Sequence, residues 1–121
     1  MSDVQVKKND KFWNFVQKVV DDSEIVVERP KGSCHPNFKE TIYITDYGYL
    51  KNTKSTDGEE IDIYIGSNGT HEVDAIAVTV DVVKRDSEIK ILVGCTQEEI
   101  KRIQEQLNGF DTACGWIINK K

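Results

Sequence analysis

The sequence lacks the features that mark membrane, secreted and fibrous proteins. It contains no apolar run of about 18 residues, the length that a membrane-spanning helix needs. It has only 2 prolines and 8 glycines in 121 residues, which excludes collagen-like and proline-rich chains. The opening segment, MSDVQVKKND, has no apolar stretch like that of a secretory signal. We therefore expect a globular, cytoplasmic protein that does not bind membranes.

Cysteine, histidine and positive charge are also scarce. The 3 cysteines and 2 histidines are widely separated, so they form neither a CxxC nor an HxxxH zinc pattern, and we expect free thiols. There are 16 Lys and Arg against 21 Asp and Glu, a net charge of -5, whereas nucleic-acid-binding proteins concentrate positive charge. No nucleic-acid partner is expected, and an anionic ligand has to be held by local charges or by a metal.

The chain length of 121 residues is typical of one domain, and we treat residues 1–121 as a single domain. Apolar spacing predicts a helix over 11–20, and a capping box at Thr96 with Glu99 predicts a second helix that ends near Asn108. Alternating or β-branched runs predict strands over 25–28, 57–65, 73–83, 88–93 and 113–118. This order predicts an α+β fold: a small, mainly antiparallel, five-stranded OB-like β-barrel with an N-terminal and a C-terminal helix.

Carboxylates cluster at a turn that enters the apolar strand predicted between Asp57 and Ile65. Asp57, Glu59, Glu60 and Asp62 fall within six residues of one another. The negative charges of these carboxylates repel one another. A hard divalent cation such as Mg²⁺, which prefers oxygen ligands, would relieve this repulsion. A solvated Asp-Gly hairpin turn without a metal remains the alternative.

Two further mixed-charge segments accompany the cluster. Lys84, Asp86, Glu88 and Lys90 are two residues apart, so an extended chain places them on one side. Two acids and two lysines could complete a metal site and present cations to phosphate, or they could form a solvated strand face. The other mixed-charge segment is residues 28–31, which include Glu28, Arg29 and Lys31. It too could either contribute to a binding site or be a solvated surface.

Tyr47, Gly48 and Tyr49 place two phenols around a glycine. Glycine permits a close backbone approach or an unusual dihedral angle. Buried tyrosines usually pack with a satisfied hydroxyl, so a packing role is as open here as a functional one.

The string YITDYGYLKNTKSTDGEEIDIYIG, residues 43–66, resembles the signature region of the family I soluble inorganic pyrophosphatases. That family has a Tyr-Gly-Tyr followed by an Asp-Gly-Asp-x-x-Asp motif and an apolar strand. The resemblance extends from Ile25 to Val93. Three departures accompany it. The segment between Gly32 and Asp46 is shorter than in the full-length enzymes, no tyrosine follows Tyr64, and Glu59 stands where the family has the middle aspartate of its motif.

The resemblance implies a role for each matching residue. The metal ligands are Asp57, Asp62, Asp86 and Glu88. The catalytic residues are Glu59, which helps to deprotonate the attacking water, Tyr47 and Lys90. The substrate-binding residues are Glu28, Arg29, Lys31 and Lys90.

The implied function is a Mg²⁺-dependent hydrolase that converts pyrophosphate, or a small phosphoanhydride, to phosphate with a metal-activated water. The implied partners are that substrate and the divalent metal, with a homo-oligomer left open. The alternative is a non-catalytic pyrophosphatase-like module that binds a phosphorylated ligand, which the shortened segment favours. An acidic interaction domain without a metal site is a third reading.

Overall fold

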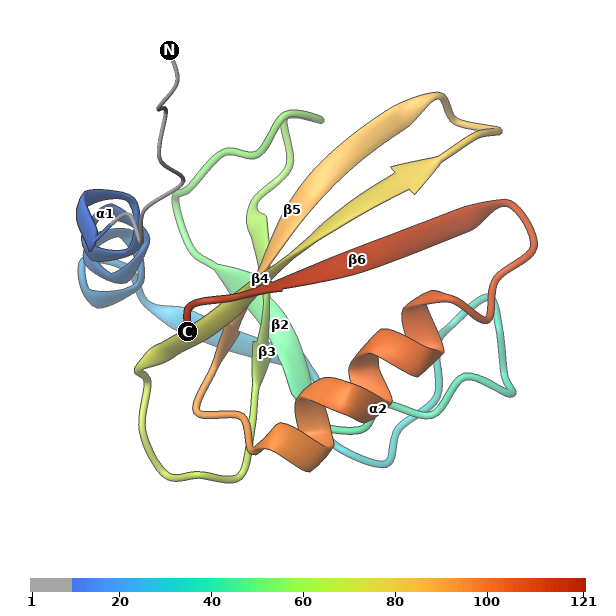
Figure 1. The fold of residues 1–121 in the computed structure, drawn as a ribbon. Coiled ribbons are helices and arrows are strands. Elements are labelled where there is room, and N and C mark those ends of the chain that lie inside the picture. The colour runs from blue at the N-terminus through green and yellow to red at the C-terminus, as the bar shows by residue number, and fades with distance from the viewer. Residues whose placement is uncertain (1–9) are drawn as a thin grey trace, which may run out of the picture.

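The computed structural model describes residues 10–121, which form two helices and a six-stranded sheet. In chain order the elements are α1 (Asp10–Asp21), β1 (Ile25–Arg29), β2 (Asp46–Leu50), β3 (Ile61–Ile65), β4 (Val73–Asp81), β5 (Asp86–Val93), α2 (Gln97–Leu107) and β6 (Ala113–Asn119). Figure 1 shows α1 and α2 on opposite sides of the sheet. The predicted α+β class and both predicted helices are confirmed.

The sheet is open and mixed. Its strand order is β1-β2-β3-β5-β4-β6, in which β3 and β5 run parallel and the other neighbours antiparallel. The prediction of a five-stranded barrel is wrong, because the described residues form six strands and leave β1 and β6 as the two edges. On β6, the Gln104 side chain of α2 donates to Gly115 O and accepts from Ile117 N, both at 2.8 Å. A side chain, not another strand, therefore satisfies these two groups.

The strand that the sequence did not predict is β2, whose residues are DYGYL. Asp and Gly are depleted in strands, so local propensity argues against one here. The segment is extended because it pairs with β1 on one side and β3 on the other. A Cβ on Gly48 would lie only 1.8 Å from Val26 O, so glycine allows β1 to approach. This confirms the close backbone approach that the sequence suggested.

Helix α2 covers one face of the sheet. Its Ile100, Ile103 and Leu107 belong to a core cluster with Ala75, Ala77, Leu92 and Ile117. The predicted capping box is present: Thr96 Oγ1 accepts from Glu99 N at 3.1 Å, and Glu99 Oε1 accepts from Thr96 N at 2.8 Å. Glu99 also accepts from Ser67 N, so the cap fastens the helix to the loop after β3.

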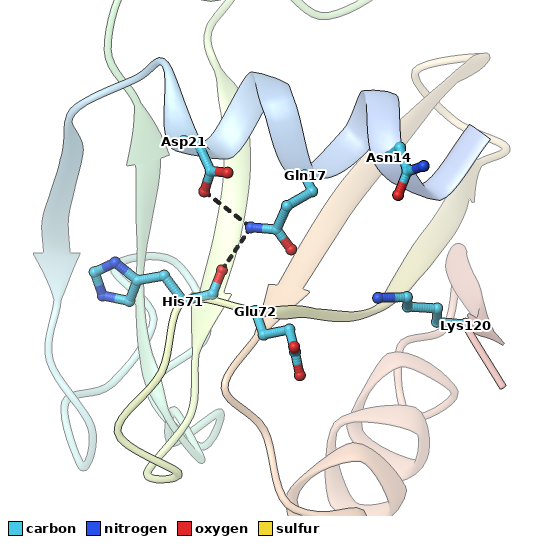
Figure 2. Close-up of a pocket in the computed structure, with 6 residues that line it drawn as sticks. All are labelled: Asn14, Gln17, Asp21, His71, Glu72 and Lys120. Atoms are coloured by element: carbon cyan, nitrogen blue, oxygen red, sulfur yellow. Dashed lines mark hydrogen bonds between the residues drawn. The ribbon is translucent and has the colours of Figure 1, made fainter. Parts of the chain in front are cut away.

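Helix α1 covers the opposite face. Trp13 and Val20 pack with Leu50, Ile63, Val73, Ile76, Ile91 and Val93. The side chain of Gln17 anchors the helix to the start of β4, since it donates to His71 O at 3.0 Å and accepts from Val73 N at 2.8 Å. Figure 2 shows Gln17 pointing from α1 toward His71.

The predicted hairpin of β4 and β5 is confirmed with shifted ends. Strand β4 stops at Asp81, whereas the prediction ran to residue 83, and β5 begins at Asp86. In Figure 1 the tip of this hairpin extends beyond both helices. Within residues 10–121, no helix is long and apolar enough to cross a membrane.

Candidate active site

Polar side chains of β2, β3 and β5 gather on the face of the sheet that α2 covers. Leu92 on β5 packs under α2, and alternation places Lys90 and Glu88 on the same face, nearer the hairpin tip. Strand β3 runs parallel beside β5, with Tyr64 opposite Leu92, so Asp62 shares that face. The structure thus places Asp62, from the predicted polar face of its strand, on the same surface as Glu88 and Lys90.

Three predicted residues form a closed hydrogen-bond network on this surface. Tyr47 Oη donates to Asp62 Oδ2 at 2.5 Å and accepts from Lys90 Nζ at 2.7 Å. Lys90 Nζ also donates to the same Asp62 oxygen at 2.9 Å. Burial, followed by the charge of Asp62, raises the pKa of Tyr47 far above its usual value. Tyr47 therefore stays a phenol and acts as a donor, not a base.

Glu88 adds a second carboxylate to this network. Its Oε1 lies 3.7 Å from Lys90 Nζ. Burial raises the pKa of Glu88; Lys90 counteracts this, whereas the charges of Asp62, Asp57 and Asp86 add to it. All three other acids predicted as metal ligands therefore lie within electrostatic reach of Glu88.

The turn before β3 holds Asp57 in a defined position. Asp57 Oδ1 accepts from Ser55 Oγ at 2.5 Å and from Glu59 N at 2.9 Å. These two bonds hold the pKa of Asp57 below its usual value. Thr56 Oγ1 donates to Ser87 O at 2.7 Å, which ties the turn to β5. The acidic turn thus lies against the strand that carries Glu88 and Lys90.

Cations and aromatic rings form the other side of the network. Arg29 Nη1 donates to Tyr43 Oη at 2.5 Å, and the guanidinium lies 5.6 Å from the centroids of both the Tyr43 and Tyr47 rings. Lys90 Nζ lies 5.3 Å from the Tyr47 ring centroid. Two cations therefore contact one buried tyrosine, which holds both beside the acids.

The sequence alone assigns no role in the site to Tyr43 or to His35. Tyr43 precedes Tyr47 by four positions, so both fall on one side of an extended chain, and this spacing was an available signal. His35 is only partly exposed and stacks on Tyr43, with ring centroids 6.3 Å apart. No local pattern indicates that contact, because the loop must fold back to make it.

Glu28, Lys31, Glu59 and Glu60 are also singled out from the sequence. The side chains of Glu28, Lys31 and Glu59 are exposed. The Lys31 backbone N donates to Asp46 Oδ1 at 2.8 Å, which fastens the loop after β1 to β2. Glu60 Oε2 accepts from Asn52 N at 3.0 Å, so this carboxylate is used within its own turn. The functional roles of these residues stay predictions.

The arrangement contains the kinds of ligand atom that a magnesium site needs, but in the described part of the chain these atoms do not converge on one point. Asp57, Asp62 and Glu88 supply the carboxylate oxygens that Mg²⁺ prefers. Within residues 10–121, however, no three Asp, Glu, His or Cys residues come together in a metal-holding group. Asp62 Oδ2 already accepts a hydrogen bond from Lys90 Nζ. The donor types therefore fit a hard cation, and Lys90 is the positive group that now neutralises them.

A surface hollow of about 420 Å³ lies at a different place, beside α1. Figure 2 shows the residues that line it: Asn14, Gln17, Asp21, His71, Glu72 and Lys120. None of the predicted site residues belongs to this set. We place the candidate active site at the acid and lysine network, because chemically coupled groups converge there.

Comparison with known proteins identifies the fold and the family. The structure is similar to the crystal structure of an inorganic pyrophosphatase from Neisseria gonorrhoeae, with a TM-score of 0.61 and 19% sequence identity over 74% of this chain and 77% of that one. A search of curated proteins gives no significant match. The model of the inorganic pyrophosphatase family matches residues 7–106, most of the chain. The chain belongs to the inorganic pyrophosphatase family.

Proposed function

We propose that this chain hydrolyses pyrophosphate, or a small phosphoanhydride, to phosphate, with Mg²⁺ as cofactor and a metal-activated water as nucleophile. The observation that carries the proposal is the network of Tyr47, Asp62 and Lys90, flanked by Glu88 and Arg29. Hydrolysis of a phosphoanhydride needs oxygen ligands for a metal beside cations for phosphate oxygens. Both kinds of group occur here. The proposal takes residues 1–121 as one domain that acts in the cytoplasm.

The acids would hold the metal. Asp57, Asp62, Asp86 and Glu88 are the proposed ligands, and their electrostatic coupling supports a shared cation. When bound, Mg²⁺ neutralises phosphate charge and lowers the pKa of a coordinated water. Glu59, in the turn beside Asp57, is the proposed acceptor of the water proton.

The cations would hold the substrate. Lys90 and Arg29 reach the network from β5 and β1, and each can donate to phosphate oxygens. Tyr47 orients Asp62 and Lys90 through its hydroxyl. Glu28 and Lys31 are proposed as further substrate contacts at the edge.

A phosphate-release assay tests the proposal. Wild-type protein with Mg²⁺, and separately with Mn²⁺, is given pyrophosphate and several small phosphoanhydrides. We expect turnover of at least one substrate and its loss in Asp62→Asn. The matched control is Asp22→Asn, because Asp22 is an exposed carboxylate just after α1 that pairs with Lys18. Unchanged activity in Asp62→Asn contradicts the site assignment.

A second candidate function is a phosphate-ligand-binding module without turnover. The contact between Lys90 and Asp62 favours it, because a lysine already neutralises a proposed metal ligand. The exposure of Glu59 also favours it. Calorimetry that detects Mg²⁺-dependent binding of pyrophosphate, together with no release of phosphate, would select this function. Turnover by the wild-type protein that disappears in Asp62→Asn excludes this second function.

A further inference from the structure

The segment between β1 and β2 forms a short hairpin that presents His35 beside the site. Gly32 N donates to Tyr43 O, Tyr43 N donates to Ser33 O, and His35 N donates to Thr41 O, each at 2.9 Å. These bonds fix the backbone on both sides of His35. A side chain on such a hairpin has a defined direction, which a free loop does not provide.

Aromatic contacts fix the ring of His35. It stacks on Tyr43 with an interplanar angle of 17°, and its centroid lies 5.0 Å from that of Phe38. Tyr43 in turn packs on Tyr47, with centroids 4.9 Å apart, and binds Arg29 through its hydroxyl. His35 is therefore joined to the network by a continuous row of rings.

Three cations lie within electrostatic reach of His35. They are Arg29 of β1, Lys90 of β5 and Lys84 of the turn between β4 and β5. Burial lowers the pKa of His35, and the charges of Arg29, Lys90 and Lys84 lower it further. The imidazole is therefore neutral near pH 7, and an anion among these cations would favour its protonation.

One ring nitrogen of His35 is already used. Asn37 N donates to Nδ1 at 3.0 Å, so in the neutral ring Nδ1 carries the lone pair and Nε2 carries the proton. Nε2–H is then a hydrogen-bond donor with a defined tautomer.

We propose that His35 Nε2–H donates to a phosphate oxygen of the bound phosphoanhydride, alongside Arg29 and Lys90. This inference rests on the proposed function and adds a substrate-binding residue that has no counterpart in the sequence motif. It assigns a use to the shortened segment between β1 and β2. His35 is a binding residue in this assignment, and it takes no part in activating the water.

The chain offers an internal control, because it has only 2 histidines and the other, His71, lines the hollow beside α1. Imidazole NMR signals of the wild-type protein are followed while imidodiphosphate, a non-hydrolysable analogue of pyrophosphate, is added with Mg²⁺. We expect the His35 signal to shift and its pKa to rise on binding, while the His71 signal stays in place. A stationary His35 signal at saturation overturns the proposal.

Substitution gives the second measurement. His35→Phe keeps the ring stack on Tyr43 and removes the donor, and we expect the KM for pyrophosphate to rise roughly tenfold or more with a smaller change in kcat. His35→Gln, which restores an N–H donor, should recover part of the loss. His71→Phe is the matched control and should leave KM unchanged. A KM equal to the wild-type value in a folded His35→Phe protein overturns the proposal.

The two hypotheses fail in different ways. Wild-type protein that hydrolyses pyrophosphate while His35 shows no shift contradicts only the role of His35. Wild-type protein that neither binds imidodiphosphate nor releases phosphate contradicts the proposed function and, with it, this inference.

Discussion

Lys90 Nζ lies 2.9 Å from Asp62 Oδ2, and the two side chains are 14% and 29% exposed. A lysine of β5 thus provides the counter-charge for a carboxylate of β3 that we propose as a metal ligand. Glu88, at 3.7 Å, shares the same ammonium. A cation bound by Asp62 and Glu88 would compete with Lys90 for these oxygens, so metal binding and the position of Lys90 are coupled.

The first prediction concerns this competition. Lys90→Met leaves the carboxylates without their internal counter-charge, so we expect the metal-free protein to lose about 1–3 kcal/mol of unfolding free energy. Mg²⁺ should restore more stability to this variant than to the wild type, because no ammonium competes for Asp62. Denaturant unfolding with and without Mg²⁺ measures both effects.

The control is Lys18→Met, since Lys18 of α1 is 74% exposed and pairs with Asp22, just after the helix. Its cost should stay below about 1 kcal/mol and should not depend on Mg²⁺. A Mg²⁺ response of Lys90→Met no larger than that of the wild type would contradict the competition.

The second prediction concerns the hydroxyl of Tyr47. Tyr47→Phe keeps the ring contacts with Tyr43 and Tyr64 but leaves Asp62 and Lys90 without their shared partner. We expect a loss of about 1–3 kcal/mol in unfolding free energy and a lower kcat for pyrophosphate. Tyr49→Phe, on the same strand, is the control. Equal effects of the two substitutions would argue against a specific role for the Tyr47 hydroxyl.

The third prediction concerns the contact between β1 and β2. In Gly48→Ala the new Cβ would lie 1.8 Å from Val26 O, so one strand must move. We expect a cost of about 3 kcal/mol or more, together with loss of activity, because Tyr47 is the neighbouring residue. Gly109→Ala, whose Cβ would meet Gln106 O at 3.4 Å, should cost far less. Thermal unfolding of both variants checks the difference.

The fourth prediction concerns pH and the α2 cap. Glu99 is 8% exposed; burial alone would raise its pKa, but its bonds from Thr96 and Ser67 prevail and hold the pKa below its usual value of 4.5. An acid with a lowered folded pKa stabilises the fold above its unfolded pKa, and this stabilisation is lost as the pH falls through the folded pKa. Stability from Glu99 should therefore be complete near neutral pH and decline below about pH 4.5.

Glu99→Gln tests whether the stability that Glu99 contributes is lost as the pH falls. We expect a loss of about 1–3 kcal/mol at pH 7 and a smaller difference from the wild type as the pH falls through the lowered folded pKa, where the wild-type carboxylate takes up a proton. Glu98→Gln, at the exposed neighbouring position, is the control. Urea unfolding across this pH range gives the comparison. A constant difference at all pH values would contradict the assignment.

Local patterns were sufficient for the helices and for one hairpin. Apolar spacing and the capping box located α1 and α2 to within one residue of their ends, because both signals lie within a few residues of the structure that they predict. Strand alternation likewise predicted that Glu88 and Lys90 lie on one side of their strand, and both contact each other there. The motif of residues 43–66 indicated the family, which the family comparison then confirmed.

Other features depended on distant parts of the chain. Strand β2 forms because β1 and β3 hold it, despite the poor strand propensity of Asp46 and Gly48. The sheet stays open with six strands, and Gln104 of α2 satisfies backbone groups on its edge strand β6. The prediction of a barrel used local strand propensity alone, and propensity carries no information about whether the first and last strands of a sheet pair with each other.

The sequence by itself determined the chemical inventory of the site: carboxylates in a turn, a lysine and acids on one strand face, and two tyrosines around a glycine. Only the tertiary structure decided which of them meet. Asp62 and Lys90 are 28 residues apart and become partners because β3 and β5 pair in parallel. Arg29 joins the site because β1 pairs with β2, and Tyr43 and His35 lie beside it because the chain between these strands forms a hairpin. Contacts of this kind follow from strand pairing and register, which are set by the packing of the whole sheet between its helices.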